Sequence, residues 1–469
     1  MREKQLIEKA KQAGQGHVFR WWNDLDANGR DRLLRQIEEM DFDLLRRLVA
    51  EHVEAEAVPK EERELEPAPI IPVPSRPQEH AAAEKARTLG EQMLREGKVA
   101  AMVVAGGQGT RLGYDGPKGT FPITPIKSKP LFQLFAERIL AHSRRYGRTI
   151  PWYIMTSITN DAATREFFEE HDYFGLSPEN VRFFTQGMLP AVDRNGKLIL
   201  DEKGHIFTSP DGHGGSLLAL KRTGMIDDMR RRGVEVISYF QVDNVLIKIA
   251  DPVFIGHHVG RGAEMSSKVV PKRDPEEGLG VVGLLNGRLS VIEYSDLSKE
   301  EMYAVTEDGR LKYSAGSVAI HLINVDFADR VTSSGLSLPY HRANKVVPYV
   351  NDRGEVTTPR EKNGIKFEMF VFDALGLARE AVTLEVRRED EFAPVKNAEG
   401  QDSPATARAA LVNMWGRWLR EAGADVPTDD KGNVKGVIEI SPLFAVDPPE
   451  LKEKLARRKI RFDNELFLE

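Results

Sequence analysis

Hydrophobic residues in the middle of the chain alternate between short apolar runs and stretches with helical spacing. Residues 99–104 (VAAMVV) are wholly apolar, which is typical of a strand buried in a parallel sheet. Residues 130–146 follow as a predicted helix. Strands and helices continue to alternate up to about residue 390. The pattern therefore predicts an α/β fold with a mostly parallel sheet covered by helices.

Further elements follow from the same pattern. Strands are predicted at residues 150–156, 181–184, 234–240, 317–323 and 382–386, and helices at 161–171, 214–221, 226–232 and 403–423. Residues 279–285 and 288–294 are joined by Asn286-Gly287, a pair that favours a type I′ turn. We therefore expect an antiparallel hairpin to interrupt the parallel pattern.

The two ends of the chain differ from its middle. Residues 1–56 are predicted helical, with one apolar helix face made of Leu33, Ile37, Met40, Leu44 and Leu48. Residues 57–79, rich in proline and glutamate, are expected to form an extended connector rather than a packed element, followed by a helix at about 80–96. A strand at 437–440 and a basic helix near 449–459 predict a small C-terminal domain. We therefore divide the chain into 1–96, 97–400 and 401–469.

Composition narrows the function classes. The 469 residues are 41% hydrophobic and 29% charged, as in an ordinary globular protein with a large core. The absence of cysteine excludes disulfides, thiolate catalysis and thiolate zinc sites. A net charge of −6 argues against nucleic-acid binding through a broad basic surface. Without an apolar leader or a run of ~18 apolar residues, we expect a cytoplasmic protein and no membrane span.

The strongest chemical signal is a glycine-rich loop after the strand at 99–104. Its sequence is AGGQGTRLG at residues 105–113, followed by PKG at 117–119. Glycines let backbone N–H groups approach a ligand closely, and a run of such groups binds anions. Arg111 and Lys118 add positive charge. The loop therefore predicts a phosphate site, although a tight turn that binds nothing is the structural alternative.

Two familiar phosphate loops do not fit. Gly107, Gly109 and Gly113 are spaced one residue too long for the dinucleotide fingerprint. The Gly-Lys pairs at 97–98 and 196–197 lack the Ser or Thr of a Walker A loop. Hydride transfer and P-loop hydrolysis are therefore disfavoured. A metal hydrolase is also disfavoured, because the eleven histidines are scattered and no His-Glu-x-x-His occurs.

The loop resembles that of sugar-nucleotide pyrophosphorylases, and nine further segments narrow the resemblance. In order, they are KPLFQ (129–133), FF (167–168), YFGL (173–176), QGMLPA (186–191), PDGHGG (210–215), VDN (242–244), VIEYS (291–295), NGIK (363–366) and REDEFAPVKNA (388–398). Together they resemble the UDP-N-acetylhexosamine branch of the UDP-sugar pyrophosphorylases, from about residue 80 to the C-terminus. The resemblance implies a Rossmann-like (GT-A-like) nucleotidyltransferase fold.

The implied reaction joins UTP and a sugar 1-phosphate into a UDP-sugar and pyrophosphate, with Mg²⁺ as cofactor. The sugar phosphate is the nucleophile and is already anionic at neutral pH, since its second pKa is about 6. No general base is therefore needed, and catalysis depends on positioning and on cations that stabilise phosphate charge. The oligomeric state does not follow from the sequence.

The resemblance carries over to particular residues. Arg111, Lys118 and Lys396 match the catalytic cations; Ala105, Gly106, Gly107, Lys118, Gln186, Gly212, Asp243 and Lys366 match the UTP site; and Asp243 is the implied Mg²⁺ ligand. His213, Gly280, Glu293, Tyr294, Ser317, Phe370 and Phe372 match the sugar site. Phe370 and Phe372 lie at i and i+2 of a predicted helix, where they cannot share a face. One of them is therefore expected to be core.

Two positions depart from the hexosamine branch. That branch has Asn where this chain has His213 and Ser317, and the UDP-glucose branch has His in the segment corresponding to His213. Both positions line the implied sugar pocket. We therefore take N-acetylglucosamine 1-phosphate as the leading acceptor, followed by glucose 1-phosphate or a broad set of hexoses. A nucleotide-sugar binding protein without catalysis is the alternative, which the joint presence of Arg111, Lys118, Asp243 and Lys396 disfavours.

Overall fold

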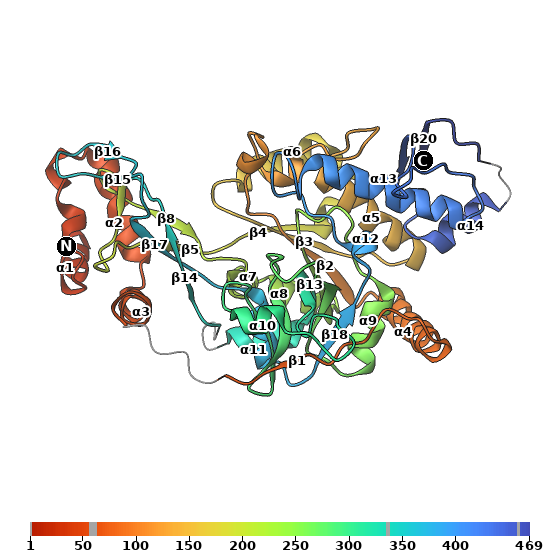
Figure 1. The fold of residues 1–469 in the computed structure, drawn as a ribbon. Coiled ribbons are helices and arrows are strands. Elements are labelled where there is room, and N and C mark those ends of the chain that lie inside the picture. The colour runs from red at the N-terminus through yellow and green to blue at the C-terminus, as the bar shows by residue number, and fades with distance from the viewer. Residues whose placement is uncertain (1, 56–62, 334–337, 457–459) are drawn as a thin grey trace. The chain divides into compact units, whose positions relative to one another are not determined.

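The strand that precedes the glycine-rich loop lies within a ten-stranded sheet in the computed structural model, which describes residues 2–55, 63–333, 338–456 and 460–469. β2 (Val99–Val104) pairs in parallel with β9 (Val236–Gln241) and β3 (Trp152–Thr156), and β3 pairs in parallel with β4 (Val181–Thr185). β2, β3 and β4 lie side by side in Figure 1. Their apolar sequences are buried because helices cover the sheet. The predicted parallel α/β centre is confirmed.

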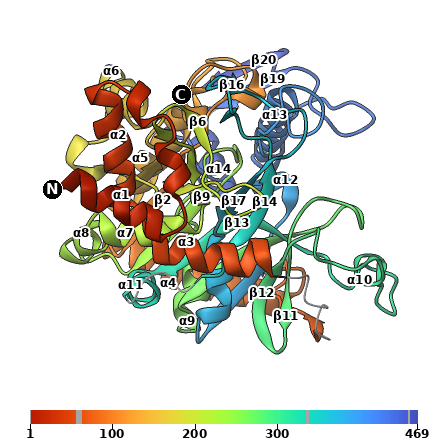
Figure 2. The same ribbon diagram turned by 90° about the vertical axis from the view of Figure 1, so that its left-hand side faces the viewer.

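The other half of the sheet is largely antiparallel. β13 (Ala315–Asn324) pairs antiparallel with β9, and β10 (Met265–Pro271) pairs antiparallel with β13 and parallel with β18 (Ala381–Glu385). The predicted hairpin is also confirmed as β11 (Val281–Leu285) and β12 (Arg288–Ile292), which project as a ribbon in Figure 2. Asn286 and Gly287 have φ values of 50° and 76°, as a type I′ turn requires.

Helices surround this sheet. They are α4 (Pro77–Arg95), α5 (Leu131–Tyr146), α6 (Asp161–Glu170), α7 (Gly215–Arg222), α8 (Met225–Arg231), α9 (Pro252–Gly260), α10 (Lys299–Tyr303), α11 (Val325–Thr332), α12 (Arg388–Glu391), α13 (Pro404–Glu421) and α14 (Pro448–Leu455). The backbones of α4 and α9 approach closely. A Cβ atom at Gly256 would lie 1.7 Å from the carbonyl oxygen of Ala86, so only glycine fits there.

The chain divides into two compact units. Unit 1 comprises Met1–Arg63, Gln186–Ser216 and Ser337–Asp373, and unit 2 comprises Glu64–Thr185, Leu217–Leu336 and Ala374–Glu469. These boundaries differ from the three predicted parts. The C-terminal residues belong to unit 2, where Trp415 and Ile440 share one hydrophobic core with Phe135 of α5. β19 (Val437–Ile440) pairs in parallel with β20 (Glu465–Leu468), and residues 457–459 of the predicted basic helix lie outside the described residues.

Unit 1 combines helices with short antiparallel strand pairs. The helices are α1 (Arg2–Gln12), α2 (Ala27–Glu39) and α3 (Phe42–Val49). The strand pairs are β5 (Met188–Pro190) with β8 (Thr208–Pro210), β6 (Leu200–Glu202) with β7 (His205–Ile206), β14 (His341–Lys345) with β17 (Gly364–Glu368), and β15 (Tyr349–Val350) with β16 (Val356–Thr357). Leu33, Ile37 and Leu48 pack with Phe367 in one core.

The apolar stripe predicted between Leu33 and Leu48 does not lie on one helix. α2 ends at Glu39, and the carboxylate of Asp41 accepts hydrogen bonds from the N–H groups of Asp43 and Leu44 at the start of α3. An Asp at this position stabilises a helix N-terminus. The single-helix prediction is wrong because the cap begins a second helix inside the stripe.

The proline-rich connector is extended but packed, so that part of the prediction is wrong. β1 (Leu65–Pro67) pairs antiparallel with β11, and the carbonyl oxygen of Leu65 accepts a hydrogen bond from the Tyr313 hydroxyl (2.7 Å). Ile71 forms a parallel bridge with Leu384. Residues 57–62 of the predicted connector lie outside the described residues.

Candidate functional site

The glycine-rich loop leaves the carboxyl end of β2 and folds back on itself. Gly109 N–H donates to Gly116 O (2.9 Å), and Lys118 N–H donates to Gly107 O (3.1 Å). These bonds bring the two predicted parts of the motif, 105–113 and 117–119, against each other. At Gly119 a Cβ atom would lie 2.1 Å from the buried ring of Phe132. The loop is therefore a defined turn that ends with the Lys118 side chain.

Asn160 is hydrogen-bonded to the backbone of the glycine-rich loop, and the sequence analysis did not single it out. It is buried, and its Nδ2 donates to the carbonyl oxygens of Ala105 (2.9 Å) and Gly107 (3.3 Å). Its Oδ1 accepts from the N–H of Ser157 (2.8 Å). Because Asn160 donates hydrogen bonds to these carbonyl oxygens, a residue that follows β3 fixes the bend of the loop. The only sequence signal is the place of Asn160 after that strand.

Four predicted residues gather beside the loop. The ammonium of Lys118 lies 3.9 Å from Oδ2 of Asp243, which sits in the turn after β9. Lys396 and Arg111 are near enough to affect Lys118 electrostatically. Lys396 comes from the segment after α12, where Val395 N–H donates to Asp243 O (2.9 Å). The structure thus brings three cations and one carboxylate together from three parts of unit 2.

The environment of Lys118 is only partly accessible to water. Desolvation is the main cause that lowers the pKa of Lys118 below the ordinary lysine value. Asp243 opposes this shift, whereas the positive charges of Lys396 and Arg111 add to it. Like charges held together in this way repel one another until an anion lies between them. The arrangement is suited to binding a polyphosphate.

A second predicted group lies on the antiparallel flank of unit 2. Ser317 N–H donates to Gly280 O (2.8 Å), and a Cβ at Gly280 would lie 3.3 Å from Oε1 of Glu293. The hydroxyl of Ser317 is buried without a hydrogen-bond partner among the described residues. Tyr294 follows β12 and is 48% exposed. Three of the predicted sugar residues therefore meet here.

Further predicted residues meet inside unit 1. Gly212 has a φ of +84°, and a Cβ atom there would lie 2.4 Å from Met369 O. Asp211 N–H donates to the carbonyl oxygen of Gly187, the residue after the buried Gln186. Only glycine fits position 212, because both the positive φ and the neighbouring backbone exclude a side chain. The predicted uracil-reading residues Gln186 and Gly212 thus lie on adjacent backbone segments.

His213 belongs to an aromatic cluster. Its ring stacks on Phe370 (centroids 5.2 Å apart) and lies against Phe372 (5.6 Å), and the Phe370 ring stacks on His341 (4.6 Å). Nδ1 of His213 accepts a hydrogen bond from the Val371 N–H (3.2 Å). Desolvation, with a smaller effect of His341, lowers the pKa of His213 to about 4. His213 is therefore neutral at physiological pH.

One of the two phenylalanines is core as expected, since Phe372 is 7% exposed, but the argument that the two rings cannot share a face is wrong. Phe370 follows β17 and Phe372 lies in a 3₁₀ turn, so neither position is on a regular α-helix. Their ring centroids are 5.1 Å apart, and both rings contact His213. The helical spacing argument was wrong because it assumed an α-helix at these positions.

Lys366 lies on β17 and so in unit 1. Its ammonium is 4.9 Å from the centroid of the Phe207 ring. Desolvation lowers the pKa of Lys366, an effect that Glu368 opposes and Lys345 increases. Within unit 1, therefore, Lys366 is a partly desolvated cation whose ammonium lies over an aromatic ring.

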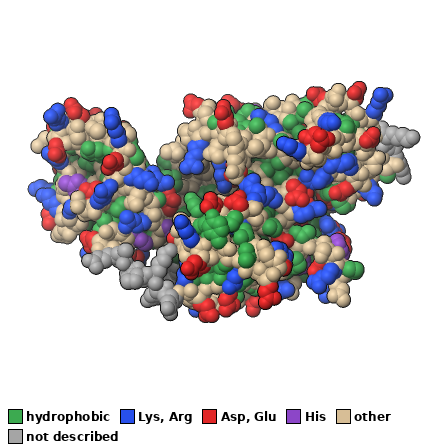
Figure 3. Space-filling model, in the orientation of Figure 1, with side chains coloured by type: hydrophobic (Ala, Val, Ile, Leu, Met, Phe, Trp, Pro, Cys, Tyr) green, Lys and Arg blue, Asp and Glu red, His purple; other side chains and the backbone are tan. Residues whose placement is uncertain are grey.

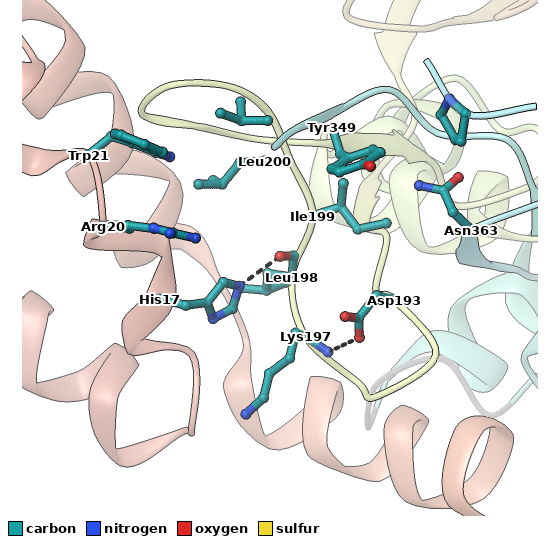
Figure 4. A pocket seen from close by; sticks show the side chains of 12 residues that line it. His17, Arg20, Trp21, Asp193, Lys197, Leu198, Ile199, Leu200, Tyr349 and Asn363 are labelled. Atoms are coloured by element: carbon teal, nitrogen blue, oxygen red, sulfur yellow. Dashed lines mark hydrogen bonds between the residues drawn. The ribbon is translucent and has the colours of Figure 1, made fainter. Parts of the chain in front are cut away.

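Two cavities lie away from these groups. One, of about 360 Å³ in unit 1, is shown in Figure 4, where His17 Nε2 bonds Leu198 O (2.8 Å) and the Lys197 N–H donates to Asp193 (2.9 Å). The other, of about 600 Å³ in unit 2, extends behind residues 246–253 and includes Trp418. Among the described residues that line them, none is a predicted site residue.

The described residues contain no group of three or more His, Asp or Glu side chains able to hold a metal ion by themselves. None of the described helices is both long enough and apolar enough to cross a membrane. On the face drawn in Figure 3, acidic and basic side chains are intermixed.

Comparison with known proteins now decides the family. Residues 42–443 match the family described as UTP–glucose-1-phosphate uridylyltransferase. The chain belongs to this family. The predicted family, and with it the class of nucleotidyltransferase, is thereby confirmed.

Relatives in this family cover almost the whole chain. UDP-N-acetylhexosamine pyrophosphorylase-like protein 1 of Homo sapiens is 39% identical, over 100% of this chain and 97% of its own. UDP-N-acetylglucosamine pyrophosphorylase of Saccharomyces cerevisiae is 38% identical, over 88% and 91%. The structure of the uridine diphosphate N-acetylglucosamine pyrophosphorylase from Trypanosoma brucei matches with a TM-score of 0.83 at 28% identity, covering 100% and 98%.

Proposed function

We propose that this chain transfers the uridylyl group of UTP to N-acetylglucosamine 1-phosphate, giving UDP-N-acetylglucosamine and pyrophosphate. The observation that carries the proposal is the group formed by Lys118, Asp243, Lys396 and Arg111 beside the glycine-rich loop. The acceptor is taken from the relatives, several of which are named for UDP-N-acetylglucosamine or UDP-N-acetylhexosamine.

In the proposed reaction the protein mainly positions the two substrates and stabilises phosphate charge. The phosphate of the sugar attacks the α-phosphorus of UTP, forming one P–O bond while the bond to pyrophosphate breaks. Lys118, Arg111 and Lys396 would stabilise negative charge on the transferring and leaving phosphates. Gln186 and Gly212 would read the uracil, and Glu293 would accept hydrogen bonds from sugar hydroxyls.

Mg²⁺ is part of the same proposal. Asp243 offers carboxylate oxygen, the ligand type that this cation prefers, and Mg²⁺ is commonly bound by one or two carboxylates together with substrate phosphates. The metal would neutralise charge on the polyphosphate. Asp243→Asn is expected to raise the Mg²⁺ concentration needed for half-maximal rate by at least about tenfold. An unchanged Mg²⁺ dependence would exclude Asp243 as its ligand.

Glucose 1-phosphate is the second candidate acceptor. It is favoured by His213, an imidazole where the resemblance to the hexosamine branch implies an amide. An acceptor panel tests both: the protein, UTP and Mg²⁺ are incubated with separate sugar 1-phosphates, and pyrophosphate release is measured. We expect the largest kcat/KM with N-acetylglucosamine 1-phosphate. If no sugar 1-phosphate of the panel gives pyrophosphate release, the result would instead favour a nucleotide-sugar binding protein without catalysis.

We also propose a cytoplasmic location. The chain has no cysteine and hence needs no oxidising compartment for folding. Cell fractionation with detection of the full chain tests this, and recovery in a secreted fraction would contradict it.

A further inference from the structure

Asn244 connects the segment that carries Asp243 with the segment that carries Lys396. The side chain is buried (3% exposed), and its Nδ2 donates to Glu391 O (2.7 Å). Its Oδ1 accepts from the Ala393 N–H (3.0 Å). One amide therefore joins the residue after Asp243 to Glu391 and Ala393, which lie five and three residues before Lys396.

Glu391, one partner of Asn244, is held in place by buried ion pairs. Lys268 of β10 is fully buried, and its ammonium lies 2.5 Å from Glu391 Oε2 and 2.6 Å from Asp251 Oδ2. Lys248 lies 3.3 Å from the other oxygen of Glu391. Burying these charges has a large desolvation cost, and hydrophobic residues of similar volume often give equal or greater stability. What the ion pairs supply is a fixed place for Glu391 at the end of α12.

The segment that follows Asn244 is held by another buried cation. Arg138 of α5 is 8% exposed and donates to the carbonyl oxygens of Val245 (2.8 Å) and Ile247 (3.0 Å). The segment after Asp243 is thus held by Arg138 on one side and through Asn244 on the other. Neither contact involves a residue predicted to touch UTP or the sugar.

We propose that Asn244 and Glu391 are positioning residues for uridylyl transfer, acting by holding Asp243 in register with Lys396. This inference rests on the proposed function, in which both of those side chains face the phosphates. Displacing a reacting or stabilising group by about 1 Å can cost about a hundredfold in rate. Asn244 is adjacent to Asp243, and its partners Glu391 and Ala393 lie five and three residues before Lys396, so loss of its hydrogen bonds would change the spacing of the two groups.

The test compares Asn244 with Asn324, a partly buried asparagine whose amide is also hydrogen-bonded at both ends. Asn324 also donates through Nδ2 to a backbone carbonyl, that of Ala263 (2.9 Å), and its Oδ1 is bonded to His258 (2.8 Å). Asn244→Leu and Asn324→Leu should both lower the thermal midpoint. Only Asn244→Leu is expected to lower kcat, by about tenfold to a hundredfold, with KM values for both substrates within about threefold of wild type.

A second variant guards against failure to fold. Asn244→Asp keeps the size and the acceptor for Ala393 but replaces the donor to Glu391 with an oxygen, so it should show the same selective fall in kcat. All variants are assayed at least ten degrees below their own thermal midpoint, with the best acceptor of the wild-type panel.

The kcat values of these variants test the positioning role of Asn244. The proposal is overturned if both Asn244 variants keep kcat within about threefold of wild type, or if Asn324→Leu loses as much kcat as Asn244→Leu. An inactive wild-type protein would instead overturn the proposed function, and this inference with it.

Discussion

The ammonium nitrogen of Lys118 lies 3.9 Å from Oδ2 of Asp243, and less than a fifth of either side chain is exposed. Lys118 follows the loop after β2, and Asp243 follows β9, the parallel neighbour of β2. Ligands of open α/β sheets gather at the carboxyl ends of adjacent strands. This pair therefore joins the predicted phosphate cradle to the predicted metal ligand.

Removing the Lys118 ammonium should slow the reaction severely. Lys118→Ala is expected to lower kcat by at least about a hundredfold, corresponding to ~3 kcal/mol, because preorganised cations stabilise phosphate charge as it moves to the leaving group. Pyrophosphate release is the measurement. The exposed Lys85 of α4 supplies the control, since Lys85→Ala should leave kcat unchanged. Activity of Lys118→Ala within a few-fold of wild type would contradict the role.

Sugar preference should respond to His213. His213→Asn replaces a neutral imidazole, stacked on Phe370, with the amide that the resemblance implies for N-acetylated sugars. We expect the ratio of kcat/KM for N-acetylglucosamine 1-phosphate over glucose 1-phosphate to rise by about tenfold, a typical effect of one changed pocket contact. His17→Asn, in the cavity of Figure 4, serves as the control. An unchanged ratio would remove His213 from the specificity argument.

Stability should decrease in mild acid because several imidazoles are held neutral. Desolvation is the largest cause that lowers the pKa values of His142, His213 and His258 to about 4 each. The unfolded imidazole titrates near ~6.5, so unfolding takes up protons between these values. Stability is therefore fully present above pH ~6.5 and is lost as pH falls toward 4, by about 2 kcal/mol per histidine between pH 7 and pH 5.

His142 offers a clean measurement of this effect. Its Nδ1 is buried without a hydrogen-bond partner among the described residues, and its ring stacks on Tyr146. His142→Phe thus removes a titrating group while keeping an aromatic ring. Urea unfolding at pH 7 and pH 5 should show a smaller loss of stability in His142→Phe than in wild type, by about 2 kcal/mol. Equal losses would mean that His142 does not take up a proton on unfolding.

Gly212 should not accept a side chain. Gly212→Ala combines a left-handed backbone with a Cβ 2.4 Å from Met369 O, so it must displace the backbone beside His213. Gly14, in the same unit, has a φ of +73° but its Cβ would lie 3.7 Å from its nearest neighbour, so Gly14→Ala reports the conformational cost alone, about 1–2 kcal/mol. Urea midpoints should rank wild type, Gly14→Ala, then Gly212→Ala. A reversed order of the two variants would show that the Met369 contact relaxes freely.

Much of the fold was predictable because it depends on local order. The apolar run of β2, the Asn286-Gly287 turn and the glycine-rich loop each carry their signal within a few residues. The division into units was not predictable in this way. Unit 1 is assembled from three separate stretches of the chain, and residues after 401 join the core of unit 2 instead of forming their own.

The candidate site was predictable residue by residue only through family motifs. Asn160 has no distinctive sequence pattern, and Asn244 is part of the VDN motif without a role that the sequence assigns, since a buried asparagine looks like any turn asparagine until its partners are known. For Phe370 and Phe372, in contrast, a sequence pattern was present but was interpreted wrongly. Their spacing was interpreted with a helical period, whereas the backbone there leaves a strand and enters a 3₁₀ turn that brings both rings together.

The sequence by itself determined the family, the parallel strands with their hairpin, and the glycine-rich loop that follows the strand at 99–104. These follow from short-range spacing, where each residue acts on its near neighbours. Only the tertiary structure decided that Lys118 meets Asp243 and Lys396, and that Asn244 ties the last two segments together. The physical reason is that such meetings depend on strand order and on which buried polar groups satisfy each other, neither of which a local pattern encodes.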